Sequence, residues 1–185
     1  GVCIISDGGM VNGTRLIHGI NSQVNCEVPI FGGMAGDSTR FKKTLVGLNS
    51  DPKPGEVVAI TFYGDTLQIK SNCDSGWNSL GLEFKITSSV ENKLFELNHK
   101  NAYDVLYEFL APDNQEDFAK TTLYYPFLLV EDGIGNVIRT PILVDHENKA
   151  LTYAGDMPEG AIVKLMKSGT MQLLDSTVDL SLIHI

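Results

Sequence analysis

The sequence contains few cysteines and no long apolar run. Its three cysteines, Cys3, Cys26 and Cys73, form no C-x-x-C pair and leave an odd thiol under any pairing. This favours a reducing compartment over a disulfide scaffold. No run of about 18 apolar residues is present, so no membrane-spanning helix is predicted. The first residues lack both Met and a basic stretch, so we expect no signal peptide but a cytoplasmic protein whose gene begins further upstream.

Basic residues are also scarce. The chain has 14 Lys and Arg against 23 Asp and Glu, a formal net charge of −9. The basic residues are scattered, and the one adjacent pair, Lys42 and Lys43, is too small a patch to bind a polyanion. Nucleic acids and anionic membranes attract clustered cations, so neither is predicted as a partner.

Patterns typical of metal and nucleotide sites are missing as well. No spacing resembles a structural zinc site or a calcium-binding loop. Asp132, Asp145 and Asp156 each lie in a separate predicted turn, and His146 lies between two acidic residues, so solvated turns are the better interpretation. Neither G-x-G-x-x-G nor a Walker A motif occurs. We therefore predict no metal and no cofactor.

The periodicities that are present predict many short strands and few helices. Residues 13–24 show helical spacing after a possible cap at Asn12, and residues 102–110 do so after Asn101. Two segments flank Gly64-Asp65 as a possible hairpin. Strands are predicted at residues 2–6, 29–31, 44–48, 56–63, 66–70, 84–89, 93–97, 125–130, 137–144 and 161–166.

These elements favour an α+β fold with mostly antiparallel sheet and a few packed helices. The acidic stretch 111–122 has no strand signal and is the predicted boundary. It separates a first region, residues 1–112, from a second, residues 123–179. The remaining residues, 180–185, resemble the translation of a sequencing-library adapter and are excluded from the fold prediction.

A glycine-rich segment follows the second predicted strand and is the first candidate binding site. Gly32, Gly33 and Gly36 occur within five residues and are followed by Asp37. One interpretation is a loop whose main-chain N–H groups hold an anion while Asp37 accepts from an amine. The other is a crossing where strands approach too closely for any Cβ.

Two further positions complete the candidate site. Trp77 follows Gly76 and is interpreted either as the aromatic wall of a pocket or as a core residue. Arg139 stands alone in an apolar strand, where its guanidinium suits a ligand carboxylate or, equally, a surface ion pair. Cys73, three residues before this glycine, lacks a neighbouring base, so nucleophilic catalysis is the weaker interpretation.

An ordered set of these features resembles the FIST family. Residues 28–37, VPIFGGMAGD, resemble the signature of the FIST N-terminal region, and Gly76-Trp77 and Glu96-Leu97-Asn98 follow in the family's order. Past the predicted boundary, the strand bearing Arg139 and the turn Pro158-Glu159-Gly160 resemble the start of the FIST C-terminal region. The sequence departs from the family at His99, where relatives usually have Gly.

The resemblance implies a sensory domain of bacterial signal transduction that binds a small ligand, proposed to include amino acids, and acts on a signalling output domain or protein. It also implies that the first half of the N-terminal region and most of the C-terminal region are missing here. Two alternatives stay open: a Cys73-dependent hydrolase or transferase, which iodoacetamide labelling would reveal, and a protein-interaction scaffold without a pocket.

Overall fold

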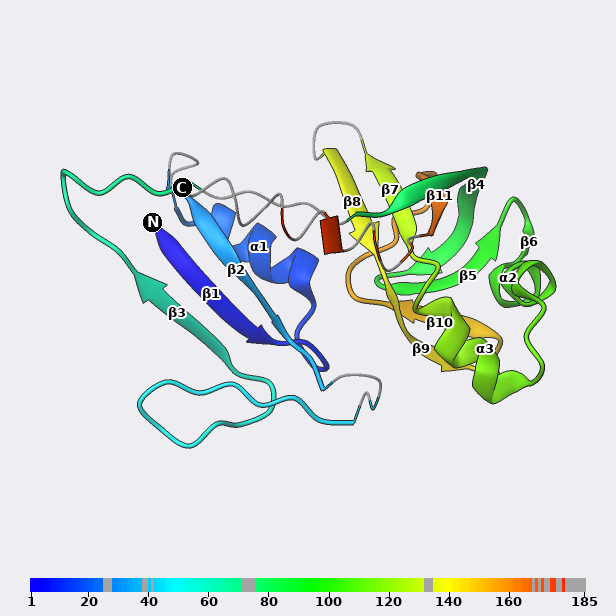
Figure 1. Ribbon diagram of the computed structural model, residues 1–185, viewed down its shortest axis with the longest axis horizontal. Helices are drawn as coiled ribbons and strands as arrows, with labels where there is room; N and C mark the ends of the chain where they lie inside the picture. The colour runs from blue at the N-terminus through cyan, green and yellow to red at the C-terminus, as the bar shows by residue number, and fades with distance from the viewer. Residues whose placement is uncertain are drawn as a thin grey trace. The chain divides into compact units, whose positions relative to one another are not determined.

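The computed structural model divides into two compact units, Gly1–Asn72 and Cys73–Ile185 (Figure 1). The structure describes residues 1–24, 28–37, 40, 42–70, 76–131 and 135–167 with a few isolated positions beyond them. Cys26, Cys73, Asp132 and the tail 180–185 lie outside the described residues. Within the described part of the chain, no helix combines the length and apolar character needed to cross a bilayer.

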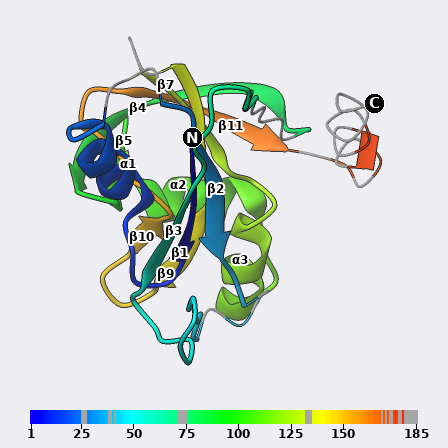
Figure 2. The same cartoon turned by 90° about the vertical axis from the view of Figure 1, so that its left-hand side faces the viewer.

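The first unit is a three-stranded sheet with one helix. β1 (Val2–Asp7) is the central strand, β2 (Ile30–Ala35) runs parallel to it, and β3 (Val57–Thr61) runs antiparallel on its other side. α1 (Gly13–Asn21) connects β1 to β2 and lies to one side of the three strands (Figure 2). The arrangement β1–α1–β2 is a parallel crossover unit, which brings the carboxyl ends of both strands to one edge.

The start of α1 is as predicted, with the Asn12 side chain accepting a hydrogen bond from the Arg15 N–H at 3.2 Å. The helix ends at Asn21, earlier than the predicted residue 24. There Ser22 N–H donates to the His18 carbonyl, and Gln23 N–H donates to the Ile20 carbonyl. The second bond spans three residues, which tightens the last turn and stops helical propagation.

Two predicted strands of the first unit do not form. In the segment 44–48, only an isolated bridge joins Val46 to Lys53. Residues 66–70 are not a strand, so the hairpin predicted at Gly64-Asp65 is wrong. Both favoured types of two-residue hairpin turn need a φ of about +60° at the first central residue. Gly64 has φ +147° and Asp65 has no positive φ, so the chain does not reverse into a paired strand.

The second unit is an antiparallel sheet of eight strands, whose path runs β8-β7-β11-β4-β5-β10-β9, with β6 paired to β5. The strands are β4 (Asn78–Val90), β5 (Lys93–Leu97), β6 (Lys100–Asn101), β7 (Phe127–Glu131), β8 (Gly135–Arg139), β9 (Pro141–Asp145), β10 (Ala150–Tyr153) and β11 (Ile162–Lys167). This confirms the prediction of an α+β fold with mostly antiparallel sheet. The predicted strand 137–144 is divided at Thr140, which alone separates β8 from β9.

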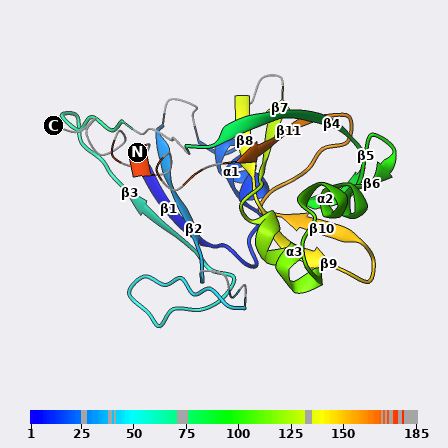
Figure 3. The same ribbon diagram turned by 45° about the vertical axis from the view of Figure 1, so that its right-hand side comes forward.

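Two helices pack beside this sheet, α2 (Ala102–Leu110) and α3 (Gln115–Thr122), next to each other and near β9 and β10 (Figure 3). α2 has the predicted bounds and its Asn101 cap. α3 lies in the stretch where the sequence indicated a domain boundary. Its N-terminal cap is Asn114, whose side chain accepts from the Asp117 N–H at 3.0 Å. Its apolar signal is weak because Phe118 alone supplies a large buried side chain.

The core of the second unit is continuous and apolar. Side chains from the sheet and both helices meet in it, and many have no exposed surface. Phe127 and Tyr153 pack ring against ring at a centroid separation of 5.9 Å, and Tyr103 meets Phe118 edge-on at 4.8 Å. The buried members are Ile86, Leu94, Leu97, Ala102, Tyr103, Leu106, Phe118, Phe127, Leu129, Leu151, Tyr153, Met157, Val163 and Leu165.

Candidate functional site

The carboxyl ends of β1 and β2 bring two glycine-containing segments together. The strand register places Asp7 opposite Ala35, and the Gly8 N–H donates to the Ala35 carbonyl at 3.1 Å. The turn after β1 therefore adjoins Gly36 and Asp37 at the end of β2. In sheets with parallel strands, ligands bind preferentially outside such carboxyl ends. This edge is the candidate site of the first unit.

Asp7 is the most tightly held side chain at this edge, and it is fully buried. Its Oδ1 accepts from the Gly9 N–H at 2.6 Å, from the Met10 N–H at 3.1 Å and from the Thr44 hydroxyl. Its Oδ2 accepts from the Gly55 N–H at 2.7 Å. Burial alone would raise the pKa of this carboxyl, but the hydrogen bonds from Thr44 and the three main-chain groups lower it to about 2. One ionised carboxylate thus joins the turn after β1 to two points of the connection between β2 and β3.

The three predicted glycines differ in their surroundings. At Gly32, φ is +144° and a Cβ would lie 1.8 Å from the Ile4 carbonyl oxygen of β1, so the close-crossing interpretation fits this position. Gly33 and Gly36 are exposed, and a Cβ on either would meet nothing within 4 Å. Gly32 and Gly33 belong to β2 and not to a loop, because their strand pairs with β1 as far as Ala35. Gly33 and Gly36 leave main chain open to solvent.

The Asp37 carboxylate organises the loop that follows it. Its Oδ2 accepts from the Lys42 N–H at 2.8 Å and from the Lys43 N–H at 3.1 Å. Its carbonyl accepts from the Arg40 Nε at 3.0 Å. The Asp37 carboxylate therefore already accepts hydrogen bonds from main-chain donors. The loop that it stabilises contains three cationic residues next to the carboxyl end of β2.

Arg139 lies at the end of β8 in the second unit, paired with Phe127 of β7. It is half-buried, and its Nε donates to the Asp156 carbonyl at 3.0 Å. The next residue, Thr140, is linked to the same segment, because its carbonyl accepts from the Ala154 N–H at 3.0 Å. These bonds fasten the corner between β8 and β9 to the segment after β10.

Gly76 and Trp77 precede β4, also in the second unit. Gly76 has φ +59°, a left-handed conformation that favours glycine, and Trp77 is half-buried. The predicted site residues are therefore divided, with Gly32, Gly33, Gly36 and Asp37 in the first unit and the others in the second. That all of them surround one ligand stays a prediction.

Asp7 is not among the site residues that the sequence predicted. The available signal was an acidic residue directly after an apolar strand and before two glycines, which is where a carboxylate can accept from successive N–H groups. Its partners Thr44 and Gly55 could not be read from the sequence, because they follow 37 and 48 residues later.

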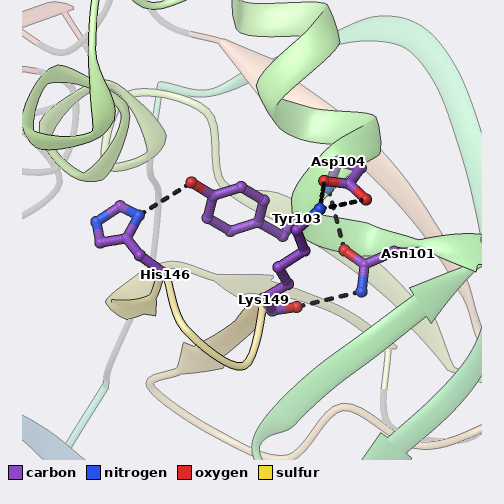
Figure 4. A network of polar contacts seen from close by, with 5 residues as sticks. All are labelled: Asn101, Tyr103, Asp104, His146 and Lys149. Carbon is purple, nitrogen blue, oxygen red and sulfur yellow. Dashed lines mark hydrogen bonds and ion pairs between the residues drawn. The ribbon is translucent and has the colours of Figure 1, made fainter.

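A second polar network lies between α2 and the turn joining β9 to β10 (Figure 4). The Tyr103 hydroxyl is 3.0 Å from His146 Nδ1, and burial raises the pKa of Tyr103. Lys149 Nζ lies 2.8 Å from the Asp104 carboxylate. The main-chain carbonyl of Lys149 accepts a hydrogen bond from the Asn101 side-chain amide. His146, interpreted from the sequence as part of a solvated turn, thus has a specific partner. The described residues contain no group of three or more acidic, His or Cys side chains placed to hold a metal.

Two family models together match nearly the whole chain. The FIST N domain model matches residues 1–100, and the FIST C domain model matches residues 102–184. The chain belongs to the FIST family, whose domains are sensory domains of signal transduction. Comparisons with curated proteins and with solved structures gave no match.

Proposed function

We propose that this FIST protein senses a small zwitterionic ligand of the amino-acid class in the cytoplasm of a bacterium and passes the signal to an output domain or protein. In this proposal Gly32, Gly33, Gly36 and Asp37 form the main-chain part of the site in the first unit. Among the residues of the second unit, Arg139 is proposed to bind a carboxylate and Gly76-Trp77 to shield an apolar group. The role is recognition and not catalysis, in keeping with the sensory character of the family.

The observation that carries the proposal is the open main chain at Gly33 and Gly36. Both glycines are exposed, and neither has a neighbour within 4 Å of a would-be Cβ, so a structural need for glycine is absent at these two positions. They stand beside a carboxyl edge that Asp7 holds in place. Main-chain N–H groups on a fixed backbone can bind an anion with little ordering cost.

A cationic loop and Arg139 supply charge of the required sign in an otherwise acidic chain. Arg40, Lys42 and Lys43 follow Asp37. Arg139 offers a planar guanidinium, which suits a carboxylate better than an ammonium group does. Binding would stabilise one arrangement of the protein over others, which is how a ligand biases a signalling partner.

Isothermal titration calorimetry of the full chain with a panel of amino acids and small carboxylates tests the proposal. For the ligand that binds, Gly33→Ala and Gly36→Ala should each weaken affinity about tenfold, because a methyl group would occupy the space beside the main chain. Gly19→Ala is the matched control, since Gly19 is equally exposed and open but lies on α1. Arg139→Lys should weaken binding of carboxylates more than that of amines.

Silence across the whole panel would remove the zwitterion hypothesis. Binding that survives both glycine substitutions unchanged would instead place the ligand elsewhere in the protein. Thermal unfolding of each variant separates loss of a contact from loss of the fold, which matters for Arg139 because it also holds the Asp156 carbonyl.

A further inference from the structure

The boundary between the two family regions cuts through a single sheet. The FIST N region ends at residue 100, yet its strands β4 and β5 lie in the middle of the second unit, between β11 and β10 of the FIST C region. We propose that β4 and β5 are the docking partner of the FIST C region, so that residues 78–97 fold and open together with residues 102–167 and independently of β1–β3.

The first support is main-chain pairing on both sides of the hairpin. β4 pairs antiparallel with β11, placing Phe84 opposite Val163, and β5 pairs antiparallel with β10, placing Leu94 opposite Leu151. Without the hairpin, β10 and β11 would each expose an unpaired edge. Addition of strands to open edges is a common mode of recognition between protein segments.

The second support is the shared core. Ile86, Leu94 and Leu97 come from the FIST N region and are fully buried among core side chains of the FIST C region. The Leu97 side chain, for example, belongs to the same cluster as Phe118 and Leu165. Burial of each such side chain removes apolar surface from water and stabilises the fold, and the FIST C region alone would lose this stabilisation.

The third support is a set of polar contacts at the tip of the hairpin. Asn92 exchanges two bonds with Tyr153, its carbonyl accepting from the Tyr153 N–H at 2.8 Å and its amide donating to the Tyr153 carbonyl at 2.9 Å. The Glu91 carbonyl accepts from the Met157 N–H at 2.8 Å. Ser89 donates through its N–H to Glu159 Oε1 at 2.9 Å and through its hydroxyl to the Met157 carbonyl.

These contacts make the segment 153–160 the place where the two family regions meet most specifically. The same segment receives the Arg139 bond at the Asp156 carbonyl. A change at Arg139 can therefore reach the FIST N hairpin through one short stretch of chain. The inference stands on pairing and burial and does not depend on the proposed ligand.

Native-state hydrogen exchange of the full chain, followed residue by residue in increasing urea, tests the inference. Leu94→Ala and Ile4→Ala form a matched pair, because both side chains are buried and both lie in the FIST N region. We expect Leu94→Ala to speed exchange in β10 and β11 by about 100-fold or more, and to leave β1–β3 unchanged. Ile4→Ala should show the reverse pattern.

Should Leu94→Ala prevent the second unit from folding, Leu94→Val provides a milder change with an expected acceleration of about tenfold. Faster exchange in β10 and β11 with either variant supports the inference. Faster exchange that stops at β4 and β5 would overturn the inference, because the hairpin would then open without the FIST C region. Faster exchange that includes β1–β3 would also overturn it, because the hairpin would then not open independently of the first unit.

Discussion

Different interactions stabilise the interior of each of the two units. In the second unit, a large set of apolar side chains is fully buried between the sheet and two helices. In the first unit, few described side chains are buried, namely Ile4, Ser6, Asp7, Thr44 and Val46. Apolar residues of its strands, such as Ile5 at 39% and Ile60 at 42%, keep substantial exposure.

This contrast indicates where each unit is vulnerable. A unit with a continuous apolar core loses stability when a core side chain is shortened. A unit with a small core depends more on a few polar contacts, and here those contacts converge on Asp7. The predictions below probe this difference, from the largest expected effect to the smallest.

Leu97→Ala should cost about 3–4 kcal/mol of unfolding free energy in the second unit, because it opens a cavity beneath a fully buried side chain. Urea denaturation followed by exchange of amides in β5 and β11 measures this effect. Leu143→Ala is the control, since Leu143 is 59% exposed and its truncation removes little buried surface. Equal losses at the two positions would contradict the description of the core.

Asp7→Asn should cost the first unit roughly 2–3 kcal/mol, because Asn replaces an ionised acceptor with an amide whose NH₂ group would face the Gly55 N–H. The loss should show in exchange of amides in β1 and β2 and leave the second unit intact. Ser6→Ala is a useful comparison, as Ser6 is also buried in β1 but carries no charge. If Asp7→Asn left β1 and β2 as protected as before, Asp7 would not be the group that holds the loops.

The same carboxylate predicts a pH dependence of the first unit. Its pKa of about 2 lies below the ordinary value of 3.8, so the folded state favours the ionised form. The stabilisation is complete above the unfolded pKa and is lost as the pH falls from about 4 to about 2. Amide exchange in β1 measured across this range should show the loss in the natural protein. The Asp7→Asn variant should not show this part of the loss of stability at acid pH.

Tyr153→Phe should stabilise the second unit by about 1 kcal/mol. The Tyr153 hydroxyl is buried and has no hydrogen-bond partner among the described residues, and burial raises the pKa of Tyr153 above its ordinary value. Removing the hydroxyl removes its desolvation cost. Thermal unfolding measures the change. A destabilised variant would show instead that a water molecule or ligand pairs with the hydroxyl in solution.

His99→Gly should raise the unfolding free energy of the second unit by up to about 1 kcal/mol. Asn98 and His99 both have positive φ, at 50° and 62°, in the turn between β5 and β6, and glycine adopts this conformation without steric cost. His99→Ala keeps the Cβ and should bring no such gain, which makes it the matched control. The difference between their melting temperatures is the measurement, and no difference would mean that the turn is not strained.

Several elements were predictable because their signals are local. The caps Asn12 and Asn101 and the bounds of β5 and α2 follow from polar residues and periodicity within a few positions. The strand predicted at 66–70 failed because a strand needs a paired neighbour, which no local pattern guarantees. α3 was missed because its cap is clear but its apolar face is small.

The candidate site was less predictable than the fold. Glycine content drew attention to the segment 32–37, but sequence alone could not distinguish Gly32, which touches the β1 backbone, from the open Gly33 and Gly36. Asp7 carries an obvious charge, yet its importance comes from donors that approach from distant loops. A side chain's partners depend on where the chain returns, and composition does not encode that position.

The sequence by itself determined the family, the α+β class and the helix caps, because each rests on ordered motifs or on interactions among near neighbours in the chain. The tertiary structure alone decided that Asp7 joins the turn after β1 to the connection between β2 and β3, and that β4 and β5 of the FIST N region complete the sheet of the FIST C region. Both depend on contacts between residues far apart in sequence, and only the folded path of the chain brings those residues within bonding distance.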